Sequence, residues 1–166
     1  MNTISTSAAT DATDPYVALH EKLLVIHRAI IATFTDVIAI EPHDLARLVA
    51  RAGDAGGFLL GHHDAESHTL FPALRRSGSL RSSDVSFLQG LDREHHALHD
   101  LTERLVAETR APHPRGPALV TLSKEILTAF SLHIRGEENG LAPDRLRTMI
   151  TLAGLEDLAR ETEARR

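Results

Sequence analysis

The segment HHDAESHTLFPAL, residues 62–74, has three His and two acidic residues within seven positions, followed by an apolar end. His62 and Glu66 are four residues apart, and this spacing places both side chains on the same face of a helix. A second segment, HIRGEENGLAP at residues 133–143, repeats the order, with His133 and Glu137 four residues apart. Both segments follow the pattern H-x-x-x-E-x-x-x-L-x-P, which indicates one chemical arrangement placed twice in the chain.

Apolar residues that recur every three or four positions predict four long amphipathic helices, and no part of the chain alternates in the manner of a strand. The first helix is expected to begin at Pro15 after the capping residue Asp14, and the second near Pro42. Proline also leads us to expect the second helix to end near Pro72 and the fourth near Pro143. Each of the four apolar stripes contains a core-facing His. The first stripe is Tyr16, His20, Leu23, His27, Ile30, Phe34 and Val37. The third stripe is Leu88, Leu91, His95, Leu98, Thr102 and Leu105. The second and fourth stripes contain His62 and His133.

The connections between these helices are short and rich in Gly, Ser and Pro, as in RRSGSLRSSD and APHPRGP. Short connections predict antiparallel neighbours, so the expected fold is an all-α, up-down-up-down antiparallel four-helix bundle. The bundle domain is expected to cover residues 15–166, with a short extra C-terminal helix from about Asp144 that Gly154 interrupts. The predicted second helix contains four glycines, which indicate either a kink or a close helix contact: Gly53, Gly56, Gly57 and Gly61.

The composition limits the partners and the location that we expect. The 166 residues have a net charge of −5 with scattered Lys and Arg, and aromatic residues make up 4%, so no nucleic acid partner is expected. No apolar run approaches the length of a membrane span, so no membrane partner is expected either. The chain has no Cys, which excludes disulfides and thiolate metal sites and fits a cytoplasmic location. Residues 1–14, rich in Ser, Thr and Ala, are expected to form a disordered tail.

Imidazoles and carboxylates on apolar stripes are costly to bury unless something binds their lone pairs. A metal does so, and a ligand set without sulfur suits iron, manganese or zinc. Four His and two carboxylates exceed the four ligands of a tetrahedral zinc, and they match two six-coordinate ions with bridging carboxylates and open positions. The two Glu-x-x-His motifs that a ferritin-like site needs are absent, and so is the H-E-x-x-H motif of metalloproteases.

The order of these motifs resembles the hemerythrin-like family, the HHE cation-binding domains: a His in the first helix, H-x-x-x-E with LFP, then EH, then H-x-x-x-E with LAP. The resemblance implies a four-helix bundle that holds two non-haem iron ions, joined by an oxo or hydroxo bridge, and that binds O₂, NO, peroxide or iron. It also implies six metal ligands: His27, His62, Glu66, His95, His133 and Glu137. Manganese or zinc in place of iron remains an alternative.

One position departs from the family pattern. Oxygen-carrying hemerythrins have a fifth His one turn before the EH motif, where this chain has Leu91. The resemblance therefore implies an additional open coordination position on one iron, which favours reactive chemistry over reversible O₂ carriage.

Several other residues are alternatives to the six. His20 and His27 lie seven residues apart, about 10.5 Å along a helix, whereas the ions of a two-metal site are about 3.5–4 Å apart, so both cannot serve one pair. The sequence HRAI favours His27 over His20. His99 is a less favoured ligand, because Leu98 fits the apolar step better. Three further His residues lie off the apolar stripes and are expected to be exposed or to lie beside the ligands without binding metal: His63, His68 and His96. Glu138 is expected to be solvated, and a hydrogen bond from it to a ligating His is the less favoured alternative.

Three kinds of function follow from these expectations. A diiron module could bind O₂ or NO for storage, delivery or sensing. An enzyme could use the same open position to decompose peroxide or to oxidise ferrous iron. Alternatively, the bundle could be structural or regulatory, responding to iron or oxygen through a partner without catalysis. The first two need an exogenous ligand at the metal, and the third does not.

Overall fold

A computed structural model describes residues 14–77 and 80–164, so the expected tail at residues 1–14 lies outside it except for Asp14. The described residues are helical with no strand, which confirms the all-α prediction. In chain order the elements are α1 (Pro15–Ile38), α2 (Leu45–Ala65), the π-helix η1 (Glu66–Leu70), α3 (Phe71–Arg76), α4 (Ser82–Thr109), α5 (Gly116–Gly140), α6 (Pro143–Met149) and α7 (Leu152–Ala164).

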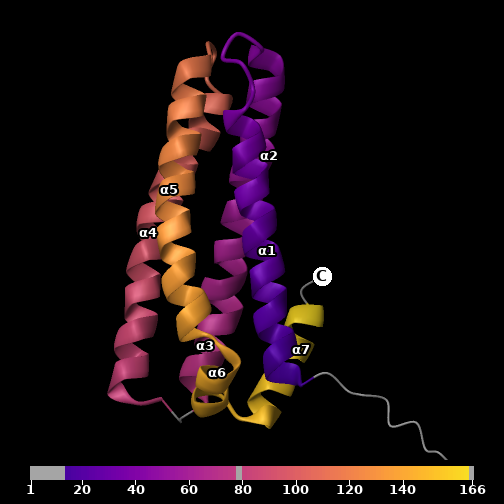
Figure 1. The fold of residues 1–166 in the computed structure, drawn as a ribbon, viewed down its shortest axis with the longest axis vertical. Coiled ribbons are helices and arrows are strands. Elements are labelled where there is room, and N and C mark those ends of the chain that lie inside the picture. The colour runs from indigo at the N-terminus through magenta and orange to yellow at the C-terminus, as the bar shows by residue number, and fades with distance from the viewer. Residues whose placement is uncertain (1–13, 78–79, 165–166) are drawn as a thin grey trace, which may run out of the picture.

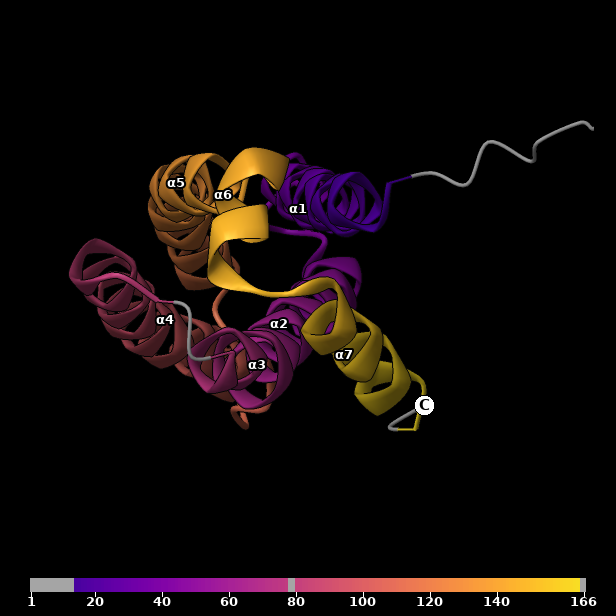
Figure 2. The same ribbon diagram turned by 90° about the horizontal axis from the view of Figure 1, so that it is seen from below.

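The four long helices α1, α2, α4 and α5 run side by side along the length of the molecule (Figure 1). Seen from one end, they surround a common interior (Figure 2). Both α1 and α4 pack against α2 and α5, and α2 and α5 also contact each other across the bundle. The short helix α6 packs on α1, and α7 packs on α1, η1 and α3 at the same end. The fold is therefore a helical bundle with a helical extension at one end.

The N-terminal start of α1 agrees with its prediction. The Asp14 side chain accepts a hydrogen bond from the backbone N–H of Tyr16 at 3.0 Å, and Pro15 occupies the first turn, where its missing N–H costs nothing. Five residues of the predicted stripe form the buried face of this helix: Leu23, His27, Ile30, Phe34 and Val37. The other two, Tyr16 and His20, are only partly buried.

The interior contains two apolar clusters with polar residues between them. On α1, Leu23 belongs to one cluster, whereas Ile30 belongs to the other. On α4, Leu91 and Leu98 are divided between the clusters in the same way. His27 lies between Leu23 and Ile30 in the sequence, and His95 lies between Leu91 and Leu98. Both His residues are therefore flanked by the two apolar clusters, which shield them from water.

Three predicted helix boundaries are wrong. Pro42 lies in the connection before α2, which begins at Leu45 after Asp44. The second helix does not end near Pro72, because η1 and α3 continue it to Arg76. The C-terminal helix is interrupted at Ile150, whose backbone is extended with φ −140° and ψ 138°, and not at Gly154.

The π-helix explains how the chain passes Pro72 without breaking. A proline in an α-helix lacks its hydrogen-bond donor and crowds the carbonyl four residues earlier. In η1 the backbone N–H of Phe71 bonds to the carbonyl of Glu66, five residues back, which widens the turn just before Pro72. Such π-turns are frequent at functional sites, and Glu66 is the first residue of this one.

Two of the mid-helix glycines behave differently from each other. A Cβ atom on Gly56 would lie 2.7 Å from Cγ2 of Val106 on α4, so this position requires glycine for the close approach of α2 and α4. A Cβ atom on Gly57 would meet nothing within 4 Å. The prediction of a close helix contact therefore holds at Gly56 and does not explain Gly57.

Among the described helices, none combines the length and the apolar character needed to cross a membrane.

Candidate metal centre

The structure brings together all six residues that the sequence predicted as ligands, and all six are buried. Ligand atoms of the first group lie within 4.8 Å of one another: His27, His62, Glu66 and Glu137. The same holds for the second group: Glu66, His95, His133 and Glu137. Because Glu66 and Glu137 belong to both groups, the cluster has two adjoining sets of donors that share their carboxylates. The six residues come from α1, α2, η1, α4 and α5, so the cluster exists only when the bundle has assembled.

The Nε2 atom of each His points towards a shared carboxylate. The nearest Nε2–oxygen distances are 3.2 Å for His27 to Glu137, 3.3 Å for His62 to Glu66, 3.4 Å for His95 to Glu66 and 3.5 Å for His133 to Glu137. In addition, the Nε2 atoms of His95 and His133 are 3.2 Å apart. Six potential electron-pair donors therefore converge on one small volume.

Three of these imidazoles are oriented by a polar contact of Nδ1, the ring nitrogen that faces away from the cluster. His27 contacts Oε1 of Glu138 at 2.9 Å, and His133 contacts Oε2 of Glu94 at 2.8 Å. His95 contacts the Ser67 hydroxyl at 3.0 Å. A carboxylate can only accept, so Nδ1 of His27 and of His133 carries the proton.

In a neutral imidazole with its proton on Nδ1, the Nε2 lone pair faces the interior. The lone pair of His27 then opposes a carboxylate oxygen of Glu137, and two acceptors repel each other. A proton can satisfy one such contact, whereas a cation satisfies them all at once. Histidines that bind metals characteristically donate their other N–H to a carboxylate or a similar acceptor.

Burial keeps two of the cluster His residues neutral at physiological pH. Burial lowers the pKa of His62 to about 3 and that of His95 to about 4. Burial opposes the charged form of His133 as well, but the carboxylates of Glu137 and Glu94 raise its pKa. Metal ligation requires neutral imidazole, so His62 and His95 are ready to bind a cation without first losing a proton.

The two central carboxyl groups differ in their protonation. Burial and the neighbouring Glu137 raise the pKa of Glu66. Burial also opposes ionisation of Glu137, but its close contacts with the imidazoles of His133 and His27 lower its pKa. Two adjacent carboxylates cannot both be ionised cheaply in a buried site without a cation. A metal ion would therefore displace the proton of Glu66 on binding.

The residues fit a metal by their unpaired atoms as well as by their type. Among the described residues, the following buried atoms have no hydrogen-bond partner: Nε2 of His27 and His62, and both side-chain oxygens of Glu66 and Glu137. Burying so many unpaired polar atoms is costly, and a cation removes that cost. Imidazole nitrogen with carboxylate oxygen is a donor set for iron, manganese or zinc.

Two alternative ligands lie outside the cluster. His20 contacts the backbone carbonyl of Leu141 at 3.1 Å, so it is His27 that the structure places among the other donors. His99 pairs with Glu103 at 3.2 Å, and 51% of its side chain is exposed.

The structure decides between the alternatives that the sequence left open for His63 and Glu138. His63 is not exposed, because only 3% of it is accessible and its ring stacks on that of His95. Its burial could have been anticipated, because Ala52, Gly56, Leu59 and His63 also follow three- and four-residue steps along α2. Glu138 was expected to be mainly solvated, yet it binds Nδ1 of His27 with 30% of its side chain exposed.

A helical bundle that buries a group of His and Glu side chains has the architecture of a cation-binding helical protein. The model of the hemerythrin HHE cation-binding domain matches residues 18–144, and the chain therefore belongs to this family. The matched range includes all six clustered residues, and it confirms the resemblance seen in the sequence. Comparisons with curated proteins and with solved structures gave no match.

Proposed function

We propose that this protein is a non-haem diiron protein, in which an up-down-up-down four-helix bundle holds two iron ions and leaves a position open to O₂, NO or peroxide. His27 and His62 would bind one ion and His95 and His133 the other. Glu66 and Glu137 would bridge the two ions. The observation that carries this proposal is the presence of two adjoining donor groups that share both carboxylates.

Two adjacent iron ions would supply electrons in pairs and a binding position for a small oxidant. The protein residues would orient the imidazoles through Glu94 and Glu138 and exclude bulk water through the apolar clusters on either side. Leu91, which is buried and has no donor atom, would supply no ligand at the position where oxygen-carrying hemerythrins have a fifth His.

A cavity beside the cluster supports access for small molecules. It has a volume of about 350 Å³ and lies between α1, η1 and α7, with His62 and Glu66 in its wall together with Leu23, Ile26 and Leu70. This cavity borders the ion that His27 and His62 would bind. The apolar residues in its wall suit small uncharged molecules such as O₂, NO and H₂O₂, although Lys22, Asp64 and Thr162 also line it.

The first test is the iron content of the protein after anaerobic loading, followed by exposure to peroxide. We expect two irons per chain and catalytic consumption of peroxide, with two H₂O₂ molecules yielding two waters and one O₂. A stable, reversible optical change with O₂ or NO and no peroxide turnover would assign a binding role instead. One zinc per chain, or an intact fold that takes up no iron, would overturn the diiron proposal in favour of a structural or regulatory bundle.

The bridging roles can be tested separately. We expect Glu66→Ala and Glu137→Ala each to prevent retention of two irons, because each change removes a ligand from both ions. Glu103→Ala is the matched control, since Glu103 is an exposed carboxylate that pairs with His99 outside the cluster. Retention of two irons by either central variant would contradict the bridging assignment.

A further inference from the structure

His63 has the properties of a ligand although the family pattern assigns it no role. We infer that His63 is a seventh protein ligand, a third imidazole for the ion held by His95 and His133, which replaces from α2 the donor that Leu91 does not provide on α4. This inference rests on the proposed diiron function and deepens it.

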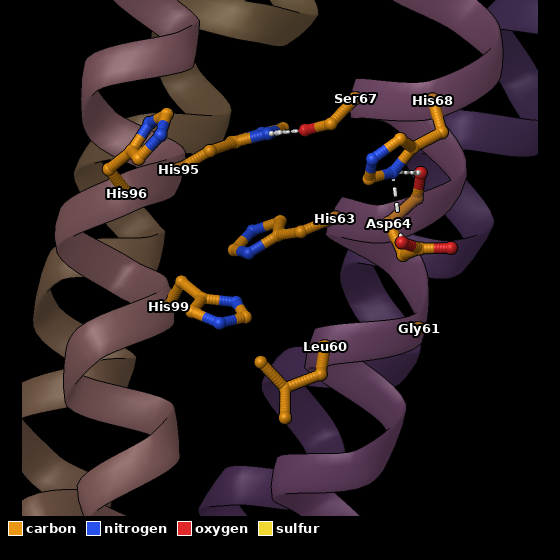
Figure 3. Close-up of a pocket in the computed structure, with 9 residues that line it drawn as sticks. All are labelled: Leu60, Gly61, His63, Asp64, Ser67, His68, His95, His96 and His99. Atoms are coloured by element: carbon orange, nitrogen blue, oxygen red, sulfur yellow. Dashed lines mark hydrogen bonds and ion pairs between the residues drawn. The ribbon is translucent and has the colours of Figure 1, made fainter.

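The position of His63 is the first argument. One nitrogen of His63 lies within 4.8 Å of nitrogens of both His95 and His133. Donors bound to one ion at about 2.1 Å lie roughly 3–4 Å from each other, so a small movement of the ring would complete a three-imidazole set. Figure 3 shows His63 extending from α2 towards α4, next to His95. Its ring stacks on His95 with a centroid separation of 4.2 Å.

The second argument is that both ring nitrogens of His63 are buried and have no hydrogen-bond partner among the described residues. Packing alone would be served better by an apolar ring at this position, because unpaired buried nitrogens cost free energy. His63 therefore has a ring nitrogen that could bind a metal and that has no hydrogen-bond partner among the described residues.

The third argument is the asymmetry that His63 would create. With His63, one ion has three imidazoles and two carboxylates, and the other ion has two imidazoles and the same two carboxylates. The ion with fewer ligands is the one held by His27 and His62, and it is the ion beside the 350 Å³ cavity. A separate groove of about 600 Å³ lies between α4 and the segment formed by α2 and η1, and His63 and His95 line it. His63 would close the metal centre on the groove side and direct small oxidants to the cavity side.

The test compares His63→Phe with the wild-type protein and with His99→Phe. Phenylalanine keeps an aromatic ring for stacking and removes both nitrogens. His99 lines the same groove but is largely exposed and lies outside the donor groups, so His99→Phe is the matched control. All three proteins are loaded with ⁵⁷Fe(II) without oxygen, and iron retention against a ferrous chelator is measured together with the Mössbauer spectrum.

In the wild-type protein and in His99→Phe we expect two irons with two distinct Mössbauer signals of equal area. In His63→Phe we expect one iron to be lost to chelator at least about tenfold more readily, because ligand loss should exceed the effect of losing an outer contact. The signal of the iron that remains bound should be little changed. Unchanged retention and an unchanged spectrum in His63→Phe would overturn the inference while leaving the diiron proposal intact. Failure of the wild-type protein to retain two irons would overturn the proposed function itself.

Metal-free unfolding separates ligation from packing. If His63 is a ligand, metal-free His63→Phe should unfold at the wild-type midpoint or above it, since the change removes unpaired buried nitrogens. A lower midpoint without weaker iron retention would mean that His63 only packs. If His63→Phe does not fold, His63→Gln is measured in the same way, and unchanged iron retention in that variant would overturn the inference.

Discussion

The imidazole rings of the metal centre are oriented by residues that do not reach the centre themselves. Glu138 and Glu94 accept from Nδ1 of His27 and His133, which leaves each Nε2 lone pair directed inward. The sequence offered this role for Glu138 only as the less favoured alternative and did not offer it for Glu94, because a helical stripe shows which residues face the core and not which neighbouring helix supplies a partner. Glu94 contacts His133 across the interface of α4 and α5, a relation that requires knowledge of the bundle.

Removing one of these outer carboxylates should weaken metal binding without removing a ligand. We expect Glu138→Ala to reduce iron affinity by about 10–100-fold, as is typical when a contact to a metal-binding His is lost. Glu138→Gln keeps an acceptor for the Nδ1–H of His27 and should retain most of the affinity. Competition with a ferrous chelator measures both, with Glu103→Ala as the control. Equal affinity in Glu138→Ala and the wild-type protein would show that His27 needs no orienting contact.

The buried His residues should make the metal-free protein sensitive to mild acid. In the unfolded chain these imidazoles bind protons below pH 6.5, whereas in the folded protein the pKa is about 3 for His62, about 2 for His63 and about 4 for His95. Below pH 6.5 the unfolded state therefore binds more protons, and the free energy of unfolding falls as the pH decreases. Each of the three contributes up to about 1.4 kcal/mol per pH unit. The raised pKa values of Glu66 and His133 act in the opposite direction, but they are two groups against three, and that of His133 acts above pH 6.5.

Denaturant unfolding of the metal-free protein at pH 7.5, 6.5 and 5.5 measures this effect. We expect similar midpoints at the two higher values and a clearly lower midpoint at pH 5.5. A midpoint that stays constant or rises at pH 5.5 would contradict the account of the buried imidazoles.

At the scale of the helices, hydrophobic periodicity was a reliable guide to the faces and a poor guide to the ends. The predicted apolar stripe of the third helix is the buried face of α4: Leu88, Leu91, His95, Leu98, Thr102 and Leu105. The errors at Pro42 and Pro72 arose because proline was taken as a sign of a helix boundary. In the structure Pro42 falls within a turn, and Pro72 follows a π-turn that no single-residue propensity predicts.

The two adjacent glycines of α2 allow the close contact with α4 to be tested directly. Alanine should favour the helix by about 1 kcal/mol at either position. At Gly57 we expect that full gain in the free energy of unfolding, because a Cβ there meets nothing within 4 Å. At Gly56 the clash with Val106 should cost about 1–3 kcal/mol and cancel or exceed the gain. Denaturant unfolding of Gly56→Ala and Gly57→Ala measures the difference, and equal stability of the two would mean that α2 and α4 can separate without cost.

At the scale of the whole molecule, the polar cluster interrupts what would otherwise be a continuous apolar interior. One apolar cluster includes Phe34, Leu105 and Phe130, and the other includes Phe71, Leu88 and Met149. The sequence could predict the six residues on these faces, since their spacing is local. It could not predict His63 as a neighbour of His95, because that contact depends on the packing of α2 against α4.

Metal removal should therefore lower the stability of the entire bundle. A ligand that binds only the folded state stabilises it by about 2.7 kcal/mol when present at 100 times its dissociation constant. We expect iron to raise the thermal unfolding midpoint of the wild-type protein and chelation to reverse the increase. Glu66→Ala should show a much smaller iron-dependent shift. An unfolding midpoint that does not respond to iron in the wild-type protein would mean that the folded state has no preference for the metal.

The π-turn at Glu66–Leu70 changes the direction in which side chains point from one part of a continuous helix to the next. Before it, the chain directs His62 and Glu66 at the metal centre, and after it the chain directs Phe71 and Leu74 into an apolar cluster. Each residue of a helix turns the chain by about 100°, so the two halves meet their separate neighbours only because the turn holds one residue more than an α-helix would. The number of residues in this segment is consequently a more stringent requirement than the identity of an exposed member such as His68. A substitution at His68 leaves the residues before and after the π-turn facing their partners. Deletion of one residue rotates one half by about 100° relative to the other, so that the metal ligands and the apolar residues cannot both face their partners.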